Sequence, residues 1–69
     1  MPVVRVSWFE GKNTATKQAV AAEITESIVK HTGTAAQYIY VIFEDVAQSD
    51  WAGAGKLYGG APDKESAGY

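Results

Sequence analysis

The chain of 69 residues contains no cysteine and only one histidine. The lack of cysteine excludes disulfide bonds. The lone histidine, His31, nearly excludes a zinc site, because carboxylates alone rarely hold structural zinc. A chain this short rarely buries enough apolar surface to fold without disulfides, a metal or partner chains. Oligomerisation is the remaining common support, so we expect a homo-oligomer.

Charge and hydropathy argue against two further classes of protein. Six basic and eight acidic side chains give a net charge of −2, and the sequence has no basic cluster, so nucleic-acid binding is not expected. No apolar run approaches the roughly 20 residues that a membrane-spanning helix needs. The start of the sequence lacks the charged segment and apolar core of a signal peptide. We therefore expect a cytoplasmic protein without a membrane partner.

The patterns that are present indicate a β-α-β unit followed by a hairpin. Residues 3–9 alternate and contain three valines, which favours a strand. A helix is predicted over residues 15–30 and a second strand over residues 37–46, and a helical crossover makes the two strands parallel. The small residues at 50–56 predict a tight hairpin around one tryptophan. The helix prediction rests on an N-cap, an apolar stripe and a terminal glycine, namely Asn13, Val20, Ile24, Ile28 and Gly33.

We therefore predict an α/β (α+β) fold with two parallel strands, one helix and a C-terminal hairpin. It should form a single domain over residues 1–58, with a mobile tail over residues 59–69 that is rich in small and charged residues. Both faces of the second strand are apolar or aromatic, so both should be covered. One helix covers only one face of a two-stranded sheet, and the other face should meet another subunit.

Pro2 stands directly behind the initiator methionine, at the start of the first predicted strand. A small residue at this position is what cytosolic aminopeptidases usually require to remove Met1. Removal would leave a secondary amine anchored to a strand, and such an amine is a candidate base. The structural alternative is that Pro2 only limits fraying or starts an edge strand.

The order and spacing of these segments resemble the 4-oxalocrotonate tautomerase family. The resemblance spans residues 2–56 and rests on no single motif. It implies a β-α-β tautomerase-like subunit that pairs through its sheet, usually in a hexamer, and that needs neither an organic cofactor nor a metal. The segments that carry it are Pro2-Val3-Val4-Arg5-Val6, Glu10-Gly11-Lys12, Ile39-Tyr40-Val41-Ile42-Phe43-Glu44 and Asp50-Trp51-Ala52-Gly53-Ala54-Gly55.

The resemblance also implies roles for individual residues. It assigns the catalytic base to Pro2, once Met1 has been removed. Lys12 matches a basic residue that binds a substrate carboxylate, where the archetype has arginine, and Trp51 matches an aromatic residue beside the proline. Tyr40 stands where the archetype has a second arginine. A tyrosine donates one hydrogen bond but has neither a positive charge nor a bidentate fork.

These roles imply a cofactor-independent tautomerase that moves a proton in a small enol or unsaturated 2-oxo acid. Pro2 would take the proton, Lys12 would hold the carboxylate, Tyr40 would donate to the carbonyl oxygen and Trp51 would exclude water. The tyrosine leaves one alternative open, which is hydration, dehalogenation or decarboxylation of a small unsaturated acid on the same scaffold. Another alternative is a non-catalytic oligomeric binding protein.

Overall fold

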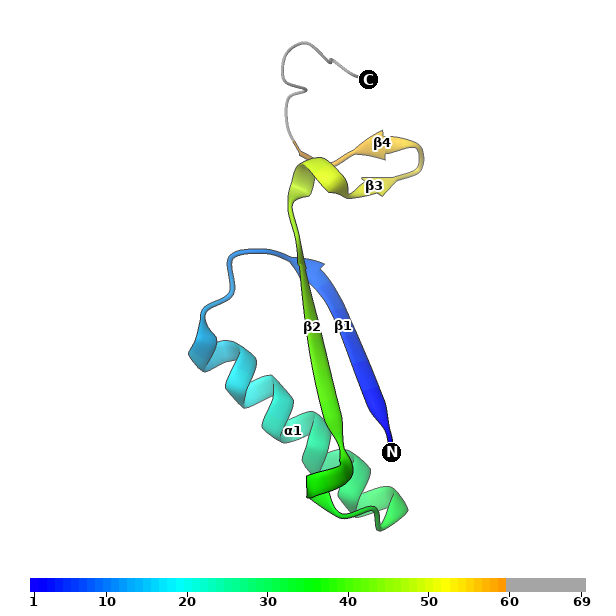
Figure 1. Cartoon of the computed structure of the whole chain (residues 1–69). Coiled ribbons are helices and arrows are strands. Elements are labelled where there is room, and N and C mark those ends of the chain that lie inside the picture. The colour runs from blue at the N-terminus through cyan, green and yellow to red at the C-terminus, as the bar shows by residue number, and fades with distance from the viewer. Residues whose placement is uncertain (60–69) are drawn as a thin grey trace.

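The computed structural model describes residues 1–59 and contains a β-α-β unit followed by a hairpin (Figure 1). Strand β1 spans Val3–Phe9, helix α1 spans Thr14–Thr32 and strand β2 spans Tyr40–Val46. The two strands pair in parallel along their whole length, so the first residue of β1 lies opposite the first residue of β2. The predicted fold class and the parallel strand pair are therefore confirmed.

Helix α1 begins one residue earlier and ends two residues later than predicted. The side chain of Asn13 accepts a hydrogen bond from the backbone N–H of Thr16 at 2.8 Å, so it is the N-cap. At the other end Gly33 has a φ of 78°, in the left-handed region, and its N–H donates to the carbonyl oxygen of Val29 at 2.9 Å. The sequence therefore predicted both caps correctly.

Strand β2 begins three residues later than predicted, because residues Ala36–Tyr38 form the 3-10 turn η1 instead. The N–H of Ile39 donates to the carbonyl oxygen of Ala36 at 3.0 Å. Pairing with β1 starts only where the N–H of Tyr40 donates to the carbonyl oxygen of Pro2, also at 3.0 Å. The apolar run continues across this boundary, so its pattern does not reveal where the partner strand begins.

The predicted hairpin is present and consists of strands β3, Ala52–Gly53, and β4, Lys56–Leu57. The short turn η2, Gln48–Asp50, joins it to β2. Its two loop residues, Ala54 and Gly55, both have positive φ, at 53° and 85°. A two-residue loop of this handedness matches the twist of the strands that it joins.

Helix α1 covers one face of the β1–β2 sheet and leaves the other face open (Figure 1). On the open face Val3, Tyr40 and Ile42 are 51%, 50% and 41% exposed. Within residues 1–59 the only buried apolar side chain is Ile39, at 8% exposure. A single chain therefore leaves much of its apolar surface in water. The half-buried side chains on the covered face are Val4, Val6, Trp8, Val41 and Phe43.

Gly59 lies at the base of the hairpin. Its N–H donates to the carbonyl oxygen of Gln48 at 2.9 Å. A Cβ atom at Gly59 would lie 2.5 Å from the carbonyl carbon of Gln48, so only glycine permits this approach. The remainder of the predicted tail, residues 60–69, lies outside the described residues. Within residues 1–59, no helix, including α1, is both long enough and apolar enough to cross a membrane.

Candidate active site

The four predicted site residues lie in two groups, at opposite ends of the β1–β2 pair (Figure 1). Pro2 and Tyr40 stand at the amino end, where both strands begin. Lys12 and Trp51 stand beyond the carboxyl end, where both strands stop. A strand of seven residues is about 20 Å long at the usual rise per residue. One chain therefore places Pro2 near Tyr40 at one end, and Lys12 near Trp51 at the other. It does not bring Pro2 close to Lys12 or Trp51.

The amino end holds the candidate base. Pro2 is half-buried, whereas Met1 before it is 81% exposed. The backbone of Pro2 is fixed to the second strand, because its carbonyl oxygen accepts the hydrogen bond from Tyr40. The Tyr40 side chain lies on the open face of the sheet, as does that of Arg5, which pairs with Ile42. This end therefore offers an amine position, a phenol and a guanidinium on one sheet.

Lys12 is held at the carboxyl end by two contacts. Its Nζ donates to the carbonyl oxygen of Phe9 at 3.1 Å. The same atom lies over the ring of Trp8, 5.0 Å from its centroid, which is a cation–π distance. Lys12 remains exposed, so its ammonium group is available to a ligand.

Trp51, the second predicted site residue at the carboxyl end, packs against the ring of Phe9. The two ring centroids are 4.5 Å apart and the rings are tilted by 57°. Tyr58 of the hairpin also contacts Phe9, at 5.7 Å, and its N–H donates to the carbonyl oxygen of Trp51 at 2.7 Å. Phe9 therefore links Lys12, through its carbonyl group, with Trp51, through its ring.

A polar network beside Lys12 was not predicted from the sequence. Asp45 accepts hydrogen bonds from Lys17 Nζ at 2.5 Å and from Trp8 Nε1 at 2.9 Å. The hydrogen bond from Lys17, followed by that from Trp8, lowers the pKa of Asp45 below its ordinary value, although desolvation opposes them. The sequence held one signal for this network, the alternation of side chains along the second strand. Asp45 falls on the same face as Val41 and therefore points toward the helix.

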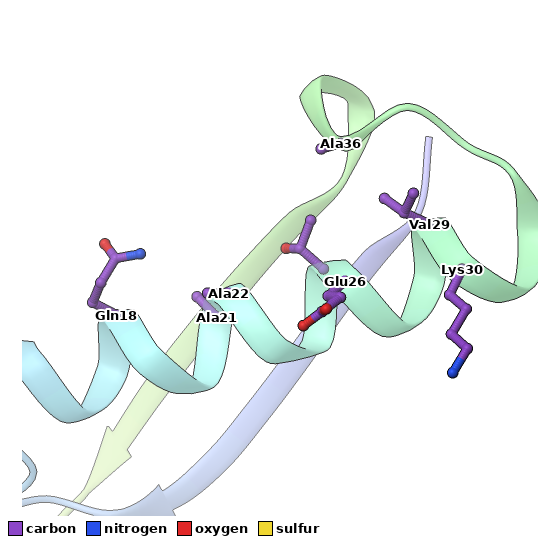
Figure 2. Close-up of a pocket in the computed structure, with 8 residues that line it drawn as sticks. Gln18, Ala21, Ala22, Glu26, Val29, Lys30 and Ala36 are labelled. Atoms are coloured by element: carbon purple, nitrogen blue, oxygen red, sulfur yellow. The ribbon is translucent and has the colours of Figure 1, made fainter.

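A hollow among the described residues lies elsewhere, along helix α1 and turn η1 (Figure 2). It has a volume of about 800 Å³ and contains none of the four predicted site residues. No cluster of three or more histidine or carboxylate side chains within residues 1–59 is arranged to hold a metal ion. The hollow is lined by Gln18, Ala21, Ala22, Thr25, Glu26, Val29, Lys30 and Ala36.

Comparison with known proteins identifies relatives of the whole described chain. Residues 2–61 match the family model described as tautomerase enzyme. A probable tautomerase of Ralstonia nicotianae is 74% identical over 62 residues, which are 90% of this chain and 95% of that protein.

Solved structures agree with this match. The crystal structure of YwhB, a homologue of 4-oxalocrotonate tautomerase, has a TM-score of 0.78 at 30% identity, over 83% of this chain and 93% of that one. A heterohexameric 4-oxalocrotonate tautomerase from Chloroflexus aurantiacus shares the fold, with a TM-score of 0.77 at 19% identity, over 84% of this chain and 94% of that one. The family match, the curated relative and the β-α-β fold agree with the resemblance seen in the sequence, and the chain belongs to the tautomerase enzyme family.

Proposed function

We propose that this chain is a cofactor-independent tautomerase that moves a proton in a small enol or unsaturated 2-oxo acid, with Pro2 as the base. Family membership supports the reaction class. The observation that carries the choice of base is the position of Pro2. It lies directly before strand β1 and is fixed by the hydrogen bond from Tyr40, while Met1 is 81% exposed. Removal of Met1 would turn a tertiary amide into a secondary amine that the sheet holds in place.

The proposed active site is completed between chains, in an assembly that we propose to be a homohexamer. Pro2 and Lys12 lie at opposite ends of one strand pair, so a site that contains both needs two copies of the chain. The exposed apolar side chains of Val3 and Ile42 supply a surface for such contacts. The known heterohexamer of the same fold supports this stoichiometry.

The chemistry follows from ordinary acid–base properties. An α-amino group titrates near about 7.7–8.0, and burial or a nearby cation lowers that pKa. A base with a pKa near ambient pH is well matched to proton transfer. The Pro2 nitrogen takes a proton from an enol hydroxyl, or from the carbon beside a carbonyl, and returns it elsewhere on the conjugated system. The products of this transfer are the keto form or the conjugated isomer.

The other residues bind and orient the substrate. The Lys12 ammonium group attracts the substrate carboxylate as a point charge. The phenol of Tyr40 donates one hydrogen bond to the carbonyl oxygen, where charge develops. Trp51 covers the reacting atoms and excludes water. Packing against Phe9 holds its ring in place for this role.

The test of this function is an ultraviolet assay of 2-hydroxymuconate and phenylenolpyruvate. Protein without Met1, verified by intact mass, should turn over at least one of them. Pro2→Ala should lower kcat by roughly 10²–10⁴-fold, the usual contribution of general acid–base catalysis. Sedimentation of the variant checks that it still assembles. An active natural protein that keeps Met1, or a Pro2→Ala variant with unchanged kcat, would contradict the proposal.

Tyr40 favours a second candidate, in which the same site hydrates, dehalogenates or decarboxylates a small unsaturated acid. Tyr40 stands at the amino end, where its backbone N–H donates to the carbonyl oxygen of Pro2, and its phenol carries no positive charge. Tyr40→Arg should therefore raise kcat/KM for 2-hydroxymuconate if the proposed tautomerase only lacks charge stabilisation. If the variant gains nothing on this substrate, product analysis with halogenated and unsaturated acids separates the alternative from a binding protein that turns over neither.

A further inference from the structure

We propose that Trp8 is a positioning residue that holds the Lys12 ammonium group where the substrate carboxylate binds. The inference rests on the role proposed above for Lys12 and extends it to a second residue, whose effect on the substrate would pass through Lys12. Lys12 Nζ lies 5.0 Å from the centroid of the Trp8 ring and 3.1 Å from the carbonyl oxygen of Phe9. The ring and the carbonyl group together define one place for an otherwise flexible side chain.

The Trp8 ring can serve this purpose because it is itself fixed. Its Nε1–H donates to Oδ1 of Asp45 at 2.9 Å. Its ring stacks on that of Phe43, with centroids 5.1 Å apart and planes 17° apart. A hydrogen bond and a stacked neighbour restrict both rotatable bonds of the indole. The Trp8 ring beneath Lys12 is therefore already in place before substrate binds.

The nearby carboxylate of Asp45 already has two donors other than Lys12. Lys17 donates to Oδ2 at 2.5 Å and Trp8 donates to Oδ1 at 2.9 Å. Within residues 1–59, the hydrogen-bond partner of Lys12 Nζ is the carbonyl oxygen of Phe9. An ammonium group has three donors, so two remain for the oxygens of a substrate carboxylate. The network thus keeps Lys12 in place and keeps it available.

A direct physical test is the NMR shift of the Lys12 side chain in the processed, assembled protein labelled at lysine Cε. Protons that lie over an indole ring move upfield. The Lys12 Cε protons should be the most upfield of the five lysines, and Lys12→Arg assigns them. Trp8→Leu should abolish this shift and Trp8→Phe should keep part of it. A Lys12 shift that does not differ between wild type and Trp8→Leu would overturn the inference.

The kinetic test asks whether this positioning affects substrate binding. An exposed cation–π contact corresponds to about a two- to fivefold effect, so Trp8→Leu should raise KM for 2-hydroxymuconate by that factor with kcat unchanged. Trp8→Phe should restore most of the loss. Val6→Ala is the matched control, because it removes apolar packing from the same face of the same strand, and it should leave KM unchanged.

A double variant separates failure of the inference from failure of the proposed function. In a Lys12→Ala background, Trp8→Leu should raise KM no further, because Trp8 acts through Lys12. A further rise in that background would overturn the positioning role. If Lys12→Ala alone leaves KM unchanged, the substrate role of Lys12 is wrong and the inference fails with it. The NMR shift then still shows which of the two steps failed.

Discussion

The two ends of the β1–β2 pair differ in how completely one chain builds them. At the carboxyl end Lys12 and Trp51 are held by a hydrogen bond, a cation–π contact and packed aromatic rings. At the amino end Pro2 is fixed through its backbone, while the Tyr40 side chain is 50% exposed on an uncovered face. One chain therefore preorganises the end proposed to bind substrate. At the end proposed to do chemistry the sheet face is open, and we propose that another chain covers it.

The largest expected effect comes from preventing that cover. Ile42→Asp places a carboxylate on the open face, and burying an unpaired charge against another chain costs several kcal/mol. The assembly should dissociate, and kcat/KM should fall by about a hundredfold or more, since each 1.4 kcal/mol is a factor of ten. Analytical ultracentrifugation and the tautomerase assay measure the two effects.

Thr14→Asp is the matched control for this variant. It adds the same charge at an exposed position in the first turn of α1, where a carboxylate suits the helix dipole. It should leave the assembly intact. An Ile42→Asp variant that stays assembled and active would remove the open face from the proposed interface.

A smaller effect is expected at the carboxyl end, in the loop of the hairpin. Ala54 has a φ of 53°, which is unfavourable for an L-residue with a Cβ atom. Asparagine tolerates this conformation and Asn-Gly is the preferred pair in such loops. Ala54→Asn should stabilise the protein by roughly 0.5–1 kcal/mol, measured as a higher urea midpoint at fixed protein concentration.

Ala52→Asn makes the same substitution in the same hairpin, at a residue that does not have a positive φ. It should give no such gain. Equal midpoints for the two variants would show that the backbone conformation of the loop is not what limits the stability of this end.

The smallest effect concerns the pH dependence of the carboxyl end. The hydrogen bonds from Lys17 and Trp8 lower the pKa of Asp45 from its ordinary value of 3.8. A carboxyl group with a lowered folded-state pKa stabilises the fold above its unfolded pKa, and this contribution is lost as the pH falls through the lowered value. The urea midpoint of wild type should therefore exceed that of Asp45→Asn at pH 7, and the difference should shrink below pH 4. A difference that does not change with pH would contradict the ion-pair account.

Local signals in the sequence predicted most of the fold. Asn13 and Gly33 marked the two ends of the helix, because capping is decided by neighbouring residues. The start of β2 at Tyr40 was missed, since it depends on where β1 begins and not on the apolar pattern around it.

The candidate site was harder to predict in its contacts than in its residues. The resemblance selects Pro2 and Lys12, and the strand predicted over residues 3–9 already places them at its opposite ends. The contact of Trp8 and Lys17 with Asp45 joins residues that are 37 and 28 positions apart in sequence. Such contacts depend on the pairing register of the two strands, which the residues around either partner alone do not reveal.

The central claim is that Pro2 of one chain works with Lys12 of another, and subunit mixing tests it most directly. Pro2→Ala and Lys12→Ala chains, each impaired alone, are unfolded together in equal amounts and refolded. If the two residues come from different chains of a symmetric assembly, about one quarter of the sites contain both, and kcat/KM should recover to about that fraction of wild type. If both came from one chain, no intact site could form, and a mixture no more active than the average of the two variants would contradict the account.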